Sequence, residues 1–168
     1  MKRSRFYAPQ VVHHQFFPST PASHVKIALA PPLARALANL GVNDLYAHQG
    51  AAIEKIRQGR NVVVATPTAS GKTLIYNLPV VETLLRDPRA KALYIFPLKA
   101  LEQDQLKTFQ EWTAAFRGEV QFPAAIYDGD TSSYRRQKIR ENIPPVLITN
   151  PDMVHLSLLA FHPQWEVF

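Results

Sequence analysis

Residues 66–73 read Thr-Pro-Thr-Ala-Ser-Gly-Lys-Thr and combine the residue types of a loop that binds polyphosphate. The first N–H groups of a helix have no partner within it, and the helix dipole adds about half a positive charge there, so a phosphate satisfies both. Gly71 lets the backbone come close, Lys72 brings a cation to the β- and γ-phosphates, and Thr73 is placed to bind Mg²⁺. The strict pattern has glycine where Thr66 stands, so the match is incomplete.

The elements on either side of this loop must present it at the end of a strand. Residues 61–65 form a short apolar, β-branched run that predicts a buried parallel strand, and a helix is predicted over residues 73–85. A strand, a loop and a helix in this order are the context that phosphate binding requires. The alternative is an ordinary turn that contains Gly-Lys-Thr by chance, and the agreement of the three elements disfavours it.

The same alternation of strand and helix continues to the end of the chain. Strands are predicted at residues 92–96, 124–127 and 146–149, and helices at 100–116, 132–142 and 151–159, with Thr131 or Ser132 as an N-cap. Before the loop, one helix is expected over residues 33–40, closed by Gly41, and another from 44 or 46 to 59. This order predicts an α/β fold with a parallel sheet.

Composition fits one globular domain, because the chain has 168 residues, of which 46% are hydrophobic and none is cysteine. Thiol chemistry and disulfide frameworks are excluded. The net charge of +6 belongs to residues 1–60, where eight Lys and Arg face two acids. Residues 1–30 are expected to form an irregular basic arm, either solvated or in contact with nucleic acid. No apolar run approaches the roughly 18 residues of a membrane span, so we expect no membrane contact and a cytoplasmic protein. The oligomeric state stays open.

The phosphate loop resembles motif I of the superfamily 2 DEAD/DEAH-box helicases, and its Thr-Pro-Thr-Ala-Ser form is similar to bacterial mitomycin-repair-type DNA helicases. The DEAD-box majority has glycine where this chain has Ala69. The resemblance implies a RecA-like P-loop NTPase domain that uses ATP and Mg²⁺, in a helicase and hydrolase of DNA repair. It implies catalytic roles for Lys72 and Thr73, with Thr73 binding Mg²⁺ through ATP. The loop residues implied to bind the nucleotide are Thr66, Thr68, Ala69, Ser70, Gly71, Lys72 and Thr73.

Leu45-Tyr-Ala-His-Gln49 is similar to the family's Q motif, and Gln49 lies 23 residues before Lys72. The family uses this glutamine to recognise adenine, and an amide can form two hydrogen bonds with an adenine edge. The ring of Tyr46 is placed to stack nearby. A solvated glutamine at a helix start is the alternative, and the spacing to the phosphate loop disfavours it.

Three later segments resemble the family's strand-binding motifs, and each follows a predicted strand. Residues 96–101 resemble motif Ia, residues 128–131 a glycine-containing turn, and residues 149–153 motif Ib. The resemblance implies binding of nucleic acid, DNA rather than RNA, by Pro97, Lys99, Ala100, Gly129, Thr149, Pro151 and Asp152. Ligands of open α/β sheets bind at this edge. The helix over 134–140 carries four positive charges, for which a solvated face is favoured over a DNA-backbone surface.

ATP hydrolysis also needs a carboxylate for Mg²⁺ and a residue that orients water, which the family supplies in an Asp-Glu motif. This sequence contains no Asp-Glu dipeptide. We therefore expect residues 31–168 to form part of a RecA-like domain, truncated before that motif and inactive in hydrolysis as an isolated chain. Two alternatives remain: a non-catalytic, basic nucleic-acid-binding protein with a relic phosphate loop, and a small-molecule kinase that uses the same loop.

Overall fold

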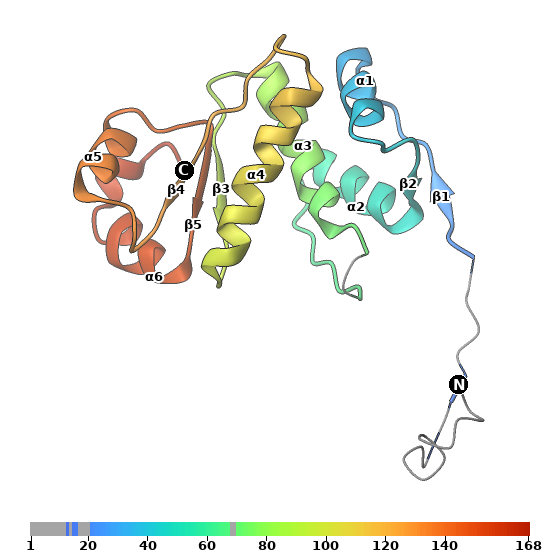
Figure 1. The fold of residues 1–168 in the computed structure, drawn as a ribbon, viewed down its shortest axis with the longest axis horizontal. Helices are drawn as coiled ribbons and strands as arrows, with labels where there is room; N and C mark the ends of the chain where they lie inside the picture. Colours follow the sequence, from blue (N-terminus) through green and yellow to red (C-terminus); the bar gives the residue numbers. More distant parts are fainter. Residues whose placement is uncertain (1–12, 14, 17–20, 68–69) are drawn as a thin grey trace, which may run out of the picture.

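The computed structural model describes residues 13, 15–16, 21–67 and 70–168 (Figure 1). Thr68 and Ala69 of the predicted loop, and much of the predicted arm, lie outside the described residues. The elements, in chain order, are β1 (His24–Val25), α1 (Pro31–Asn39), β2 (Leu45–Tyr46), α2 (Ala47–Arg57), α3 (Lys72–Arg86), β3 (Ala92–Ile95), α4 (Lys99–Ala115), β4 (Ala124–Tyr127), α5 (Ser133–Glu141), β5 (Val146–Thr149), α6 (Pro151–Met153), η1 (Val154–Leu159) and η2 (His162–Trp165). No helix in the described part of the chain is long and apolar enough to cross a membrane.

The main sheet has three parallel strands in the order β3-β5-β4. Tyr94 of β3 and Ile126 of β4 both pair with Ile148 of β5. All four residues of the central strand are buried, which explains its uninterrupted apolar run. The predicted α/β fold with a parallel sheet is confirmed.

Alternate residues of the strands enter two separate cores. Val146 and Ile148 of β5 pack in the larger core with residues from α1, α3 and α4, whereas Leu147 packs on the opposite face with Ile139 and Trp165. Figure 1 accordingly shows α4 between the sheet and the group α1–α3, with α5 and α6 on the other side of the sheet. Helices on both faces are the arrangement expected of a parallel sheet.

The predicted buried strand at residues 61–65 is wrong. These residues are neither helical nor in a strand, and Val63 is 96% exposed. Within the described residues no strand pairs with this segment. An apolar, β-branched run becomes a strand only when a neighbour accepts its backbone hydrogen bonds, and local composition does not supply that neighbour.

The first part of the chain adds a short antiparallel ribbon that the sequence pattern did not predict. β1 pairs with β2, and Ala47 N–H donates to Ser23 O at 2.8 Å. A Cβ built on Gly50 of α2 would overlap the side chain of Val25, so glycine lets the ribbon lie on the helix. Both helices predicted before the loop are present: α1 lies between β1 and β2 along the chain, α2 follows β2 directly, and Gly41 follows α1 with a φ of +77°.

Candidate functional site

Gln49 joins the start of α2 to the predicted phosphate loop. Its side chain is 4% exposed, and both ends of the amide are used. Oε1 accepts a hydrogen bond from the N–H of Tyr46 at 2.8 Å, and Nε2 donates to the carbonyl of Gly71 at 3.0 Å. Next to it, Nε2 of His48 lies 3.1 Å from the carbonyl of Ser70. The structure thus brings the predicted glutamine and the predicted loop together.

Gly71 occupies a position that only glycine suits. Its φ of +74° lies in the left-handed region, which side chains disfavour. A Cβ at this position would also overlap Nε2 of Gln49. The hydrogen bond between Gln49 and Gly71 therefore depends on the missing side chain.

Lys72 folds back over the loop from the first residue of α3. Its Nζ donates to the carbonyls of Thr66 at 2.9 Å and Pro67 at 2.7 Å. The hydroxyls of Thr66 and Ser70 lie 2.6 Å apart and within 3.4 Å of the same ammonium group. Thr66, which replaces the usual glycine, thus contributes a side-chain contact inside the loop.

A cleft of about 570 Å³ opens beside the loop, and Tyr46, Gln49, Gly71 and Thr73 are among its lining residues. The ring of Tyr46 is 40% exposed and stacks on His48, with ring centroids 5.7 Å apart. α3 has 15 residues and no acid in its first turn, so its positive dipole end is not neutralised locally. An aromatic ring, an amide and a helix start in this order fit a purine nucleotide whose phosphates lie at the loop.

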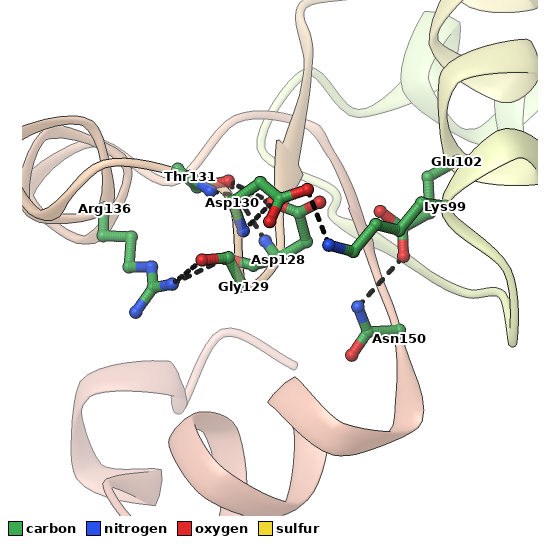
Figure 2. Close-up of polar contacts among 8 residues, drawn as sticks. All are labelled: Lys99, Glu102, Asp128, Gly129, Asp130, Thr131, Arg136 and Asn150. Carbon is green, nitrogen blue, oxygen red and sulfur yellow. Dashed lines mark hydrogen bonds and ion pairs between the residues drawn. The ribbon is translucent and has the colours of Figure 1, made fainter.

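The carboxyl ends of the three strands carry the other predicted residues. Pro97, Lys99 and Ala100 are exposed after β3, Gly129 is exposed after β4, and Pro151 and Asp152 are exposed after β5. Lys99 Nζ bonds to Asp130 Oδ2 at 2.6 Å, which joins the first two segments (Figure 2). This hydrogen bond raises the pKa of Lys99 above its ordinary value.

Thr149 is the exception among these predicted residues. Its side chain is fully buried, and its hydroxyl donates to the carbonyl of Tyr127 at 2.6 Å. In this arrangement the hydroxyl holds two neighbouring strands together and does not face a ligand at the surface. The side chain of Asn150 caps the following turn, where its Oδ1 accepts from the N–H of Met153 at 3.0 Å.

Two buried carboxyl groups, those of Glu102 and Asp128, lie at the same edge, and neither was among the predicted binding residues. Glu102 of α4 is fully buried, and its Oε1 accepts from Asn150 Nδ2 at 3.1 Å (Figure 2). Burial raises the pKa of Glu102, although the hydrogen bond from Asn150 acts in the opposite direction. Burial also acts to raise the pKa of Asp128, but hydrogen bonds from Thr131 and Asp130 outweigh it and hold that pKa below its usual value.

The position of Glu102 could have been recognised from helical periodicity. With Gln105, Phe109 and Trp112 it follows the 3–4–3 spacing of the buried face of α4. A carboxyl group on such a face needs a hydrogen-bond partner, and the apolar pattern alone does not say which one.

The expectation that the charged face of α5 is simply solvated is wrong for two of its arginines. Arg136 Nη2 donates to the carbonyls of Asp128 at 2.9 Å and Gly129 at 2.8 Å, and Arg140 Nη1 donates to the hydroxyl of Tyr127 at 3.0 Å. Their long side chains reach back over the helix to groups that need donors. α5 therefore supports the turn after β4.

Comparison with known proteins gives a consistent result. The family model of the DEAD/DEAH box helicases matches residues 46–167. The ATP-dependent helicase HRQ1 of Saccharomyces cerevisiae is 39% identical over 170 aligned residues, which cover 100% of this chain and 15% of that protein. The uncharacterized ATP-dependent helicase YprA of Bacillus subtilis is 44% identical over 130 residues, which cover 77% of this chain and 17% of that protein.

Among solved structures, the DUF1998 helicase MrfA bound to DNA and AMPPNP superposes with a TM-score of 0.81 at 39% identity. The superposition covers 88% of this chain and 21% of that one. The chain thus spans between 15% and 17% of the length of the two curated relatives described above.

Proposed function

Because the chain belongs to the DEAD/DEAH box helicase family, we propose that it supplies the ATP-binding loop and part of the DNA-binding surface of an ATP-dependent DNA helicase. The observation that carries this proposal is the contact between Gln49 and Gly71, at the point where α3 begins. This contact supports the proposal, because Gln49 matches the glutamine that the family uses for adenine and Gly71 belongs to the loop proposed to hold the phosphates.

Each residue of the nucleotide site has a distinct task in this proposal. Tyr46 and Gln49 hold the adenine, Lys72 and the first N–H groups of α3 hold the phosphates, and Thr73 binds Mg²⁺. To bind phosphate, Lys72 exchanges its contacts with the loop carbonyls for stronger, charge-assisted ones. Bound ATP would supply the free energy of its hydrolysis only in a chain that also carries the carboxylates needed for that reaction.

The DNA-binding part of the proposal rests on the edge of the sheet. Residues 97–100, Gly129 and the exposed residues 151–152 of α6 follow the carboxyl ends of the three strands, and Lys99 joins the first two of these segments through Asp130. The similar MrfA structure is bound to DNA, which favours DNA over RNA as the partner. Phosphate contacts from N–H groups and Lys99 would bind any sequence.

We also propose that the 168-residue chain binds ATP without hydrolysing it at a helicase rate, since its sequence has no Asp-Glu dipeptide. The test is titration of the full chain with a fluorescent ATP analogue in the presence and absence of Mg²⁺. Lys72→Ala should weaken binding at least about tenfold, because a charge-assisted contact to phosphate is lost. Lys107→Ala, an exposed lysine on α4, is the matched control.

The outcomes separate the proposals. Equal affinities for K72A and K107A would contradict the nucleotide site. DNA-stimulated turnover that K72A abolishes would contradict the proposed lack of hydrolysis. Salt-dependent DNA binding with no ATP binding by the wild type would favour the relic-loop alternative.

A further inference from the structure

A separate cavity, of about 420 Å³, lies between α5 and the helical segments that follow β5. Tyr127, the last residue of β4, and Met153 of α6 are among its lining residues, so it lies next to the carboxyl ends of two strands. Figure 1 shows α5 and α6 on the side of the sheet away from α3 and the phosphate loop. The cavity is therefore distinct from the proposed nucleotide site and adjoins the exposed Pro151 and Asp152.

The charged residues that line this cavity are positive. Arg136 and Arg140 both line it, together with Ser157, and no Asp or Glu is among its lining residues in the described part of the chain. Within the described residues neither arginine forms an ion pair with a carboxylate. Glu141, which follows Arg140 on α5, is paired with Lys138 instead. An anion in this cavity would meet two cations and no opposing carboxylate.

The hydrogen bonds around the two guanidinium groups leave donors unused. Nη2 of Arg136 donates to two carbonyls of the turn after β4 (Figure 2), whereas its buried Nε has no acceptor among the described residues. Nη1 of Arg140 donates to the hydroxyl of Tyr127, which lies 2.9 Å from Oγ of Ser157. Because Tyr127 accepts from an arginine, its own proton can go to Ser157, and the serine hydroxyl then keeps a free donor. Phosphate oxygens are acceptors that suit such a set of donors.

Apolar side chains line the rest of the cavity. Leu156 and Phe161 are among them, and they are 64% and 54% exposed, respectively. Proteins bind single-stranded nucleic acid by combining cations that hold phosphates with aromatic rings that stack on bases. An apolar polypeptide in the same place would leave the charges of Arg136 and Arg140 without a counter-charge. The mixture of charged and aromatic groups therefore favours a nucleotide of a strand as the occupant.

We propose that this cavity binds one nucleotide of single-stranded DNA, with the phosphate on Arg140 and Arg136 and the base against Phe161. The cavity extends the DNA-binding surface from the carboxyl ends of the strands to α5, so this assignment rests on the DNA-binding function proposed above. Lys99 at the same edge is already paired with Asp130. The two arginines thus supply positive charge that the Lys99–Asp130 pair does not.

The test is titration of the full chain with a fluorescent oligothymidylate at several salt concentrations. Arg140→Ala should weaken binding at least about tenfold, because a charge-assisted hydrogen bond to phosphate is lost. The slope of log affinity against log salt concentration should become shallower by about 0.7, the value for one phosphate contact of a single strand. Arg135→Ala is the matched control, since Arg135 is an exposed arginine of the same helix outside the cavity, and its affinity and slope should stay close to those of the wild type.

A second variant separates phosphate binding from the support that Arg140 gives to Tyr127. Arg140→Lys keeps the positive charge, so it should bind more tightly than R140A and keep the salt slope of the wild type. An equal loss of affinity in R140K and R140A, with the slope unchanged in both, would overturn the phosphate contact.

The base contact has its own test. Phe161→Ala should weaken binding at least about fivefold, because stacking on a base is lost. Leu159→Ala, an exposed leucine outside the cavity, is the control and should bind as the wild type does. The loss in F161A should disappear with an oligonucleotide made of abasic sites, which keeps the phosphates. Equal affinities of F161A and L159A for the oligothymidylate would overturn the base contact.

The remaining outcomes separate this proposal from the function on which it rests. If the wild type binds DNA, and R140A and R135A have equal affinities and slopes, the cavity is not a binding site and the proposed function stands. If the wild type binds no DNA, the proposed function fails and this assignment fails with it. Displacement of the DNA by an equimolar amount of thymidine monophosphate would overturn a strand as the occupant and indicate a site for a free nucleotide.

Discussion

Substitution of Gly71 tests how the proposed nucleotide-binding loop is held. Gly71→Ala adds one methyl group at a residue with a φ of +74°, where it meets the amide of Gln49. Gly59→Ala is the matched control, because Gly59 has a φ of +73° and nothing within 4 Å of a Cβ. The two variants share the backbone penalty and differ only in the contact with Gln49.

The expected magnitudes follow from these two terms. A left-handed backbone costs an alanine about 1–2 kcal/mol, and this is all that G59A should lose. In G71A the Gln49 side chain must also move, and it leaves hydrogen bonds to Tyr46 and Gly71. At about 1 kcal/mol for each bond, G71A should lose about 3–4 kcal/mol in total.

Urea unfolding of the full chain measures both losses, and a double-mutant cycle isolates the contact. In a Gln49→Ala background the overlap is absent, so G71A should lose no more than G59A loses. ATP-analogue affinity should fall in G71A and stay unchanged in G59A. If G71A and G59A are equally destabilising in the presence of Gln49, the reasoning about this contact is refuted.

Three further predictions concern the packing of α2 on α3 and the pH dependence of the stability of the fold. Arg57→Ala should lower the free energy of unfolding by about 1.5–3 kcal/mol, because Nε of Arg57 donates to the mostly buried Glu82 at 3.1 Å. Arg89→Ala is the control and should have little effect, because the ion pair of Arg89 with Asp87 is exposed. Asp128→Asn should destabilise at neutral pH, and its difference from the wild type should close as pH falls below 3.8, because a lowered pKa contributes stability only while the group is ionised. The contribution of Glu102 to stability has the opposite pH dependence, because its pKa is raised in the folded protein. This contribution is lost as pH rises above 4.5 and through the raised pKa, so the free energy of unfolding of E102Q should increase relative to that of the wild type at higher pH. Urea titrations at several pH values check all three.

The sequence pattern predicts the sheet and its helices well where the signal is local. β4 and β5 coincide with the predicted ranges, and Ser132 caps α5 as expected, with its Oγ accepting from Arg135 N–H. Residues 61–65 form an apolar, β-branched run as β5 does, but no strand pairs with them within the described residues. Strand formation is decided by pairing, and pairing partners distant along the chain are not encoded in a short window.

In the candidate site, too, some contacts could be predicted from the sequence and others could not. The spacing between Gln49 and the loop predicts that they meet, and Nε2 of Gln49 does bond to Gly71. The contact between Glu102 and Asn150 joins residues 48 positions apart, and neither belongs to a pattern that names the other. The burial of the Thr149 side chain could not be predicted either, because the sequence does not distinguish a buried from an exposed threonine at this position.

The G71A experiment is informative because residues 61–65, which precede the loop, pair with no strand in the described part of the chain. A loop that follows a paired strand is held by the hydrogen bonds of the sheet. Here the side chains of Gln49, His48 and Lys72 contact the backbone carbonyls on both sides of the loop, at residues 66–67 and 70–71. Each such bond contributes only about 0.5–1.5 kcal/mol, so the loss of two of them changes how firmly the loop is held. The glutamine that the family uses for adenine is then also a structural support of the phosphate loop. If Gln49 also recognises adenine as proposed, one side chain serves both tasks, and a change at Gln49 is expected to affect both ATP binding and loop geometry.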